Sequence, residues 1–266
     1  MFSKSSTNTE SSHERVRDMS IESRADLVAM QKIGSIVAQV LRAMKAEVIP
    51  GKTTAEVDRV GAETMKRNDA RSAPQIQYGY PAATCISVND EIVHGIPGDR
   101  RLQPGDIVTV DVAAELDGYI ADAAVTVVAG KATPLNERLI GCAQRAFAKS
   151  MRFARADRPI RRLGQAIERQ VRSEGFYVLH ELTGHGVGRD LHEEPTVPNY
   201  GPIGMRDRFT EGLVVTVEPI ISVGTNRFYE LADGWTTKTV DGSFAAHHEH
   251  TIVITNGKPI ILTSAA

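Results

Sequence analysis

Residues 106–122 read DIVTVDVAAELDGYIAD, and this stretch decides the fold. Its β-branched run predicts a strand over residues 106–115. The pair Asp117-Gly118 favours a two-residue turn, so residues 119–128 are expected to return as the second strand of a hairpin. The sequence therefore predicts an antiparallel sheet.

One acidic residue of this hairpin stands in an apolar run. Asp111 lies inside IVTVDVA, where a bare carboxylate is very costly unless it is paired, protonated or bound to a metal. If the turn has two residues, position 111 faces position 124, and Asp122 becomes the diagonal neighbour of Asp111 at about 7–8 Å. Two converging carboxylates repel each other unless a proton or a cation intervenes, and a cation is the simpler answer. Taken alone, the pair also allows Asp122 to point into solvent.

Helices and further strands are expected on both sides of the hairpin. Apolar residues at three- and four-residue steps from Leu27 to Met44 predict an amphipathic helix, which the turn at 50–51 ends. Thr53 and Glu56 have the spacing of a capping box. Further helices are expected up to residue 67, from 134 to about 155 and from 162 to 173, with strands at 84–88, from 176, at 213–221 and at 249–254. The order helix, helix, strands occurs twice, which predicts an α+β fold with two pseudo-symmetric halves.

Length and composition exclude several classes of protein. The 266 residues carry a formal net charge of −2 with both signs interspersed, so no nucleic-acid or membrane partner is expected. The first 20 residues are polar and lack the apolar run of a signal peptide, so none is expected, and no stretch approaches 18 apolar residues. Cys85 and Cys142 are expected to be buried free thiols in a reducing cytoplasm. We expect a cytoplasmic monomer with a mobile tail over 1–20 and a single domain over 21–266.

Two further acids interrupt expected strands. Glu218 ends the run LVVTV, and Glu249 opens the run TIVI. Each could be a strand-end residue that reaches water. Together with the two acids of the hairpin, they indicate a shared site.

Three histidines lie in glycine-containing or turn-like segments. His185 stands among the glycines of GHGVG, where residues without Cβ let the backbone approach a ligand closely. His94 occurs in VHGIP before the hairpin, and His192 occurs in LHEEP. A lone histidine is most often a hydrogen-bonded bystander, but three in such segments favour a functional site.

Two other histidine patterns need separate interpretation. HELTGH at 180–185 resembles a zinc-helix motif but has one residue too many, which turns its histidines about 140° away from a shared helix face, so the motif is rejected and His180 and Glu181 are interpreted as structural. Near Glu249, strand alternation places His247 on the same face, and His248 and His250 on the other. These three histidines are expected to lie behind the metal ligands or at the surface.

Five motifs, in this order, resemble the type I methionine aminopeptidases. They are VHGIP at 93–97, DVAAELDGYIAD at 111–122, GHGVG with LHEEP at 184–195, VEP at 217–219 and EHT at 249–251. The resemblance covers about residues 21 to 264. It implies the pita-bread fold, a curved antiparallel sheet flanked by helices from two pseudo-symmetric halves, which agrees with the order of elements above.

The resemblance also implies a dinuclear metal site. Its expected ligands are Asp111, Asp122, His185, Glu218 and Glu249. Asp122 and Glu249 would bridge two divalent ions, for which manganese, iron, cobalt and zinc all suit the donor set. The ions would activate a bridging water that removes the initiator methionine from nascent proteins, with the ribosome as one place of action. Glu218 would move a proton, and His94 and His192 would contact the substrate and stabilise the tetrahedral intermediate.

The expected pocket for the substrate side chain departs from the family's pattern. The positions that match are Tyr80, Cys85 and Trp235. The segment PQIQY at 74–78, with Pro74 and Gln77, lacks the family's usual cysteine and second tyrosine, and Leu191 replaces a usual phenylalanine. Aromatic rings and a polarisable thiol suit a thioether, so these losses would widen the pocket or change its preference.

Two alternative functions are weighed against this one. An Xaa-Pro peptidase on the same fold would use the same metals on a different N-terminus, but GHGVG and LHEEP argue against it. A non-catalytic binding protein would use the fold to hold a partner, but the presence of all five expected ligands argues against that as well.

Overall fold

A computed structural model describes residues 21–264, so the tail expected over 1–20 lies outside the described residues. The helices are α1 (Arg24–Glu47), α2 (Thr54–Arg67), α3 (Ala73–Tyr78), α4 (Pro134–Ser150), the 3-10 helix η1 (Met151–Phe153) and α5 (Ile160–Ser173). The strands are β1 (Arg71–Ser72), β2 (Cys85–Val88), β3 (Ile107–Leu116), β4 (Tyr119–Val128), β5 (Tyr177–Val178), β6 (Gly184–Gly186), β7 (Glu193–Val197), β8 (Val214–Val217), β9 (Ile220–Ser222), β10 (Phe228–Glu230), β11 (Thr237–Thr239), β12 (Ala245–His247), β13 (His250–Val253) and β14 (Ile260–Ile261).

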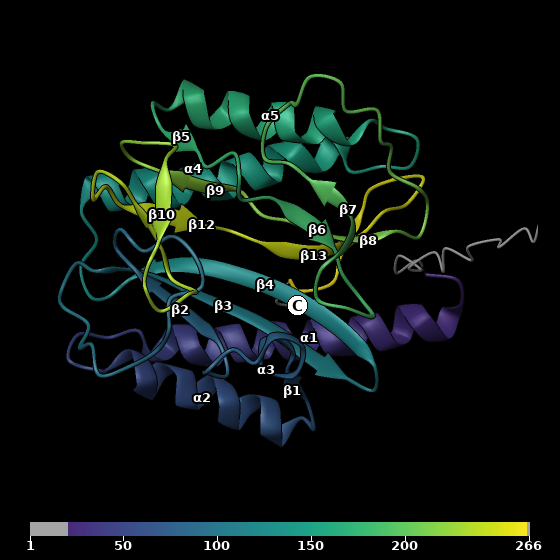
Figure 1. Cartoon of the computed structure of the whole chain (residues 1–266). Helices are drawn as coiled ribbons and strands as arrows, with labels where there is room; N and C mark the ends of the chain where they lie inside the picture. The colour runs from purple at the N-terminus through teal and green to yellow at the C-terminus, as the bar shows by residue number, and fades with distance from the viewer. Residues whose placement is uncertain (1–20, 265–266) are drawn as a thin grey trace, which may run out of the picture.

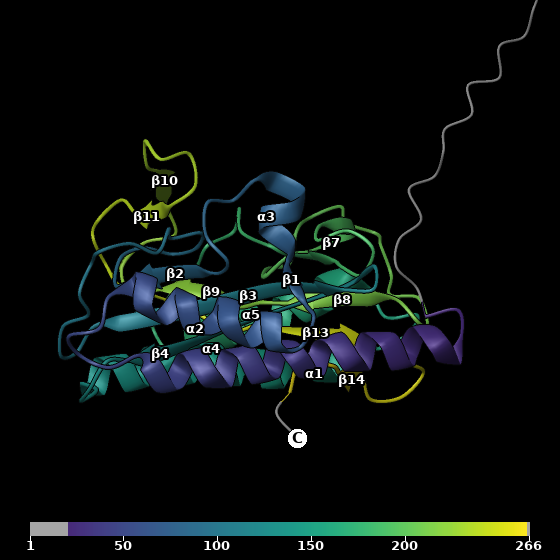
Figure 2. The same cartoon turned by 90° about the horizontal axis from the view of Figure 1, so that it is seen from below.

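Antiparallel sheets lie between two layers of helices (Figure 1). α1 packs on β3 and β4, while α4 packs on α5 and on β12. Seen from below, α1 and α2 lie side by side across the sheet (Figure 2). The order helix, helix, strands occurs in each half of the chain as predicted.

The two halves contribute separate sheets that meet at β4. In the first half, β3 pairs with β1, β2 and β4; in the second, the order is β14-β13-β8-β6-β7, with β12-β9-β5 beside it. The hydroxyl of Thr251 donates to the carbonyl of Asp122 at 2.7 Å and accepts from its amide at 2.9 Å. The amide of Glu249 donates to the carbonyl of Ala124 at 2.9 Å. Acids from both halves are thereby brought to one seam.

The hairpin of β3 and β4 has the predicted register. Asp117 and Gly118 have φ angles of 52° and 79°, as a two-residue type I′ turn requires. Asp111 faces Ala124, and Asp122 faces Ala113. Asp111 and Asp122 are therefore diagonal neighbours on one face of the ribbon, which confirms the predicted geometry.

The ends of helices lie where the sequence predicts them when a capping residue determines the end. Thr53 caps α2, and its capping box with Glu56 is formed as predicted. The helix expected to reach residue 155 instead changes to 3-10 geometry after Ser150. The strand expected over 213–221 is divided into β8 and β9, because Pro219 has no amide hydrogen for a continuous ladder. This break frees Glu218 from the strand.

The long helix α1 meets the length and composition criteria for a membrane span, which differs from the sequence-based expectation. Half of its apolar window is buried inside the fold. Met30, Ile33, Val37 and Met44 are fully buried and belong to the main apolar core. The apolar stripe of α1 is thus used in packing against the sheet.

We expect Gly34→Ala to destabilise the protein by about 1–3 kcal/mol, because the added Cβ would overpack the core. That Cβ would lie 2.5 Å from the carbonyl oxygen of Leu262. Gly141→Ala in α4 is the matched control, since its Cβ would meet only the flexible end of Arg145. The control should gain about 0.5–1 kcal/mol from helix propensity. Urea unfolding measures both, and equal free energies of unfolding for the two variants would contradict the packing argument.

Candidate metal centre

Side chains from widely separated segments line one cavity of about 200 Å³. The predicted metal ligands among them are Asp111, Asp122, His185, Glu218 and Glu249. His94 and His192 line the same cavity. Asp111 and His185 keep part of their surface open to it, whereas the other three predicted ligands are buried. The structure therefore brings all seven predicted residues together.

The four acids resist ionisation in this environment. Burial, with a further contribution from neighbouring carboxylates, raises the pKa of Asp111 and of Glu249 well above their usual range. Burial raises the pKa of Asp122 to about 6 and that of Glu218 to about 8. Ionised acids at this density need a compensating positive charge.

The two nitrogens of the His185 ring have different surroundings. Its Nδ1 lies 2.9 Å from the carbonyl oxygen of Gly186, and because a carbonyl only accepts, Nδ1 carries the proton. Burial lowers the pKa of His185 to about 3, so the ring is neutral. The unprotonated Nε2 therefore lies 3.6 Å from Oε1 of Glu218. Two lone pairs that face each other across this gap favour a cation between them.

Glu218 is held through one carboxylate oxygen and through its backbone carbonyl. Thr216 donates its hydroxyl hydrogen to Glu218 Oε1 at 2.6 Å and accepts the amide of His185 at 3.0 Å. Asn199 donates its side-chain amide to the carbonyl of Glu218 at 2.8 Å. These contacts hold the acid at the end of β8 in a single orientation.

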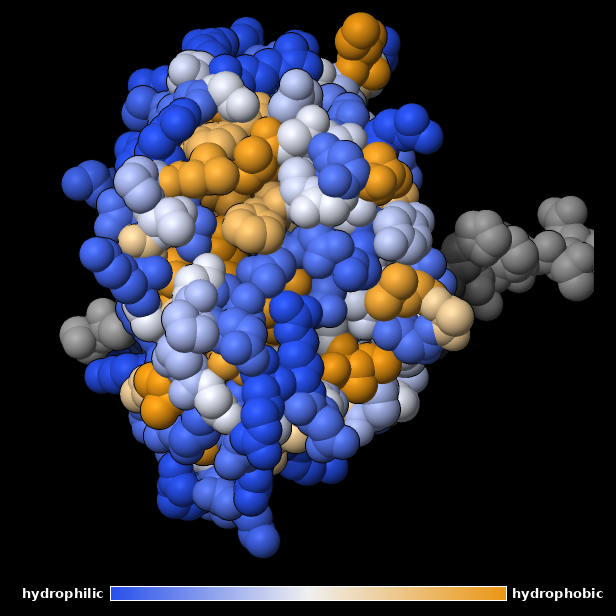
Figure 3. Space-filling view, turned by 90° about the vertical axis from the view of Figure 1, so that its left-hand side faces the viewer, coloured by the Kyte–Doolittle hydropathy of each residue, from blue (hydrophilic) through white to orange (hydrophobic). Residues whose placement is uncertain are grey.

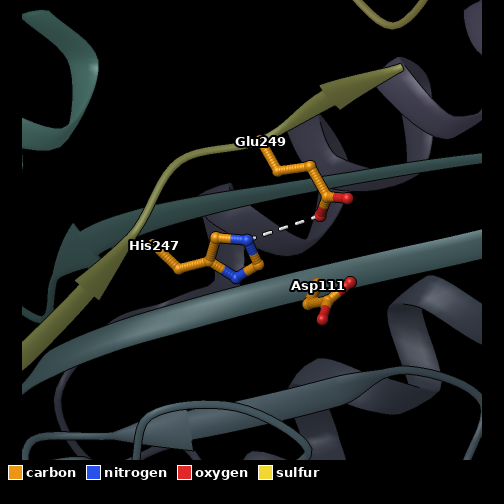
Figure 4. A group of neighbouring side chains, drawn as sticks. All are labelled: Asp111, His247 and Glu249. Carbon is orange, nitrogen blue, oxygen red and sulfur yellow. Dashed lines mark ion pairs between the residues drawn. The ribbon is translucent and has the colours of Figure 1, made fainter. Parts of the chain in front are cut away.

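The donor set fits divalent metal ions. Oδ1 of Asp122 is buried without a hydrogen-bond partner among the described residues. Two groups of three side chains have donor atoms that lie within 4.8 Å of one another inside each group. One group is Asp111, His247 and Glu249, and the other is Asp122, His185 and Glu249. The first group is drawn in Figure 4. Carboxylate oxygens with imidazole nitrogens suit manganese, iron, cobalt or zinc.

His247 was expected behind the ligands or at the surface. It is 2% exposed, which excludes the surface, and it lines the cavity beside Glu218 and Glu249. The predicted alternation is correct, because His248 and His250 lie on the other face, with ring centroids 5.3 and 5.1 Å from that of Phe147. Alternation placed His247 on the face of Glu249, but it could not give the distance of the ring from the acids.

His180 and Glu181, which the sequence predicts to be structural, lie in different surroundings. His180 stacks on Tyr200, with ring centroids 4.3 Å apart, and faces Glu168. Glu181 is exposed and lines the cavity, and its structural role stays a prediction. Its position at the cavity rim follows from the loop conformation, which no local pattern predicts.

A second cavity of about 90 Å³ adjoins the first, since His94, His192, Asp111 and Asp122 line both. The predicted pocket residues all line it: Tyr80, Cys85 and Trp235. Two positions that differ from the family's pattern also line it, Pro74 and Leu191. The acid cluster thus opens directly into a small pocket walled by aromatic, thiol and aliphatic groups.

The segment 74–78, which differs from the family's pattern, also contacts His192. The hydroxyl of Tyr78 lies 2.8 Å from Nδ1 of His192. Gln77 accepts the amide of Leu191 at 2.8 Å, and its side-chain amide donates to Asp190 at 3.1 Å. Sequence reasoning treated this segment only as a change of the pocket and missed Tyr78, because the two segments are 114 residues apart.

His94 has a backbone conformation that is uncommon for its residue type. Its φ of 58° lies in the left-handed region, where histidine is enriched among non-glycine residues. The next residue, Gly95, has no room for a side chain, because a Cβ would lie 2.4 Å from the carbonyl oxygen of Ile86. The sharp turn delivers the His94 ring to both cavities.

Larger cavities lie elsewhere on the described chain. One of about 510 Å³ lies beside α2 and α3, and one of about 380 Å³ lies beside the C-terminal end of α5. A space-filling view shows apolar and polar areas interspersed on one face of the molecule (Figure 3). In residues 21–264, the groups of three or more metal-binding side chains both occur in the acid-lined cavity, so chemistry and not volume identifies the site.

Comparisons with known proteins agree with this geometry. Residues 28–256 match metallopeptidase family M24. The chain is 41% identical to methionine aminopeptidase 2 of Bacillus subtilis over 92% of its own length and 99% of that protein. The crystal structure of methionine aminopeptidase from Thermotoga maritima superposes with a TM-score of 0.89 at 38% identity, covering 93% of this chain and 100% of that one.

A more distant structure shares only the fold. The prolidase from Pyrococcus furiosus superposes with a TM-score of 0.73 at 22% identity, and the matched region covers 92% of this chain and 65% of that one. Together these structures confirm the expected pita-bread fold.

The metal-free protein is expected to lose stability as the pH rises from about 6.5 to about 8. The pKa of Glu218 is raised from 4.5 to about 8 in the folded protein, so over this range the folded state keeps a proton that the unfolded state has released. Buried histidines such as His185 act in the opposite direction, but only below their ordinary pKa of 6.5. Scanning calorimetry in chelator measures the effect.

Added manganese should raise the melting temperature more at pH 8 than at pH 6, because the ion binds ionised acids. A melting temperature of the chelated protein that rises between pH 6.5 and 8 would contradict the raised pKa of the acids.

Proposed function

The chain belongs to metallopeptidase family M24, and from that membership we propose that it removes the initiator methionine from the N-termini of newly made proteins. One observation carries the proposal: the acid-lined cavity opens into the pocket of Tyr80, Cys85 and Trp235. Aromatic rings and a thiol around a small pocket suit the thioether of methionine. We further propose that the protein acts as a cytoplasmic monomer, on chains that emerge from the ribosome.

A divalent metal is part of this chemistry, since the family consists of metallopeptidases. We propose that two ions are held by Asp111, Asp122, His185, Glu218 and Glu249. When bound, such ions supply Lewis acidity that activates a water and polarises the scissile carbonyl. Glu249 belongs to both donor groups, which supports a role in holding both ions, and Asp122 would share that role as the resemblance implies.

We propose that Glu218 carries the proton from the attacking water to the leaving amine. Its carboxylate lines the cavity beside the other acids, which supports this role. The hydroxyl of Thr216 donates to Oε1, and the other oxygen, Oε2, lies 3.8 Å from Nε2 of His247. Fixed orientation reduces the reorganisation that a proton transfer requires.

His94 and His192 are proposed to donate hydrogen bonds to the substrate carbonyl and to the oxyanion that forms from it. Both rings lie where the two cavities meet, beside the expected position of the scissile bond. Burial lowers the pKa of His94 to about 4, and that of His192 also lies below its usual value, so both act as neutral donors. Tyr78 holds the ring of His192 through Nδ1.

The position of the pocket accounts for action at a chain end. The small pocket of about 90 Å³ adjoins the acids, and the free amine of the first residue would bind at the ions held there. An Xaa-Pro peptidase is not favoured, since the likeness to prolidase is limited to the fold.

Asp111→Ala and Glu249→Ala are expected to reduce methionine release from Met-Ala-Ser below detection, because each removes a ligand. His192→Ala should retain the metal and lose turnover. Metal content by mass spectrometry and peptide hydrolysis, with Leu-, Ala- and Ala-Pro-initiated peptides for comparison, separate these effects. Asp207→Ala is the control, because this acid is exposed and outside the cavity. Normal activity in either ligand variant would contradict the assignment.

Tyr78→Phe is expected to lower kcat about three- to tenfold with little change in KM, because it removes one hydrogen bond to His192. The profile of kcat against pH should also shift, since the hydroxyl contacts the titrating ring. Tyr177→Phe serves as the control, because Tyr177 is exposed and lies outside both cavities. Equal kcat and an unchanged pH profile for both variants would remove Tyr78 from the mechanism.

A further inference from the structure

One buried side chain beside the acids has no part in the mechanism proposed above. His247 is the last residue of β12 and is 2% exposed. Among residues 21–264, neither of its ring nitrogens has a hydrogen-bond partner. Buried polar atoms are normally satisfied, so an imidazole with two unpaired nitrogens indicates a missing partner.

The distances around this ring are those of atoms that share a cation. Nε2 of His247 lies 3.6 Å from Oε2 of Glu249 and 3.8 Å from Oε2 of Glu218. Both separations are too long for hydrogen bonds. Two ligands at about 2.1 Å from one ion, at a tetrahedral angle, lie about 3.4 Å apart. The observed separations from Nε2 are close to this value.

Asp111 completes the arrangement. Donor atoms of Asp111, His247 and Glu249 all lie within 4.8 Å of one another. Figure 4 shows the three side chains converging from the strand of Asp111 and from the segment that carries His247 and Glu249. The strands of both halves thus aim donors at the same point.

The backbone holds His247 in this place without using its ring. Its amide donates to the hydroxyl of Thr126 at 2.8 Å, and that hydroxyl lies 2.8 Å from the carbonyl oxygen of His247. β12 also pairs with β9, where His247 faces Ile220. The ring is therefore positioned by strand pairing, and both nitrogens remain available.

We propose that His247 is a sixth protein ligand of the metal centre and binds through Nε2 the ion held by Asp111 and Glu249. This inference rests on the metal centre of the proposed function. A second imidazole beside His185 makes the donor set richer in nitrogen. Imidazole favours cobalt, iron and zinc, whereas carboxylate oxygens suit manganese, so His247 shifts the preference of the site away from manganese.

The test compares metal binding by the metal-free full chain and by His247→Gln. Glutamine keeps a polar side chain but removes the imidazole, while His250→Gln is the matched control from the other face. His250 Nδ1 lies 2.9 Å from Thr263 Oγ1, and the ring contacts Phe147. Calorimetric titration with Co²⁺ and with Mn²⁺ gives affinities, and unfolding in chelator checks that each variant is folded.

We expect His247→Gln to weaken Co²⁺ binding at one site at least tenfold, with a smaller loss for Mn²⁺, and His250→Gln to bind both ions as the wild type does. Proton NMR of the Co²⁺-loaded wild type provides a second measurement. It should contain two strongly shifted, exchangeable imidazole N–H signals, from His185 and His247, and His247→Gln should retain one. The wild-type count tests the proposal even where the variant fails to fold.

Three outcomes would overturn the inference, and each differs from failure of the proposed function. One shifted imidazole signal in the wild type would leave His185 as the single histidine ligand. Unchanged Co²⁺ affinity in folded His247→Gln would show that the ring does not bind the ion. Tighter binding of both ions by folded His247→Gln would show that the ring opposes metal binding and does not contribute to it. A wild type that binds neither ion would instead refute the metal centre of the proposed function, and His247 as its ligand with it.

Discussion

Repulsion among four carboxylates in one closed cavity is the constraint on which the rest of the structure depends. Asp111, Asp122, Glu218 and Glu249 cannot all be ionised there without a positive partner, because burial and their mutual proximity both oppose charge. The fold nevertheless fixes them in place by strand pairing and by hydroxyl contacts. The folded chain therefore stores an unfavourable arrangement that binding of divalent ions relieves, so metal affinity and folding are linked.

The seam between the two halves is where this arrangement is built. Thr251 exchanges two hydrogen bonds with the backbone of Asp122, and the amide of Glu249 donates to Ala124. An acid from the first half and one from the second are thus joined through neighbouring backbone atoms. Separation of the halves would move the donors apart, and so the site requires the complete α+β core to be assembled.

Local rules predicted the parts that depend on neighbours in sequence. The turn at Asp117 set the register of the hairpin and placed Asp122 diagonal to Asp111, and the capping box of Thr53 fixed the start of α2. The positions of Tyr78 and His247 could not be predicted in this way. Each depends on contacts between distant segments, which leave no periodicity in the sequence.

Hydrogen bonds between α3 and the loop before β7 link the shape of the side-chain pocket to the position of a proposed catalytic histidine. Gln77 binds the backbone beside Leu191, which walls the side-chain pocket, while Tyr78 contacts His192. Because adjacent residues of one short helix reach both groups, a change that reshapes the pocket also disturbs the histidine. Evolutionary change at this helix is consequently epistatic: a substitution that alters selectivity needs a compensating partner in the loop, which restricts the paths open to this lineage.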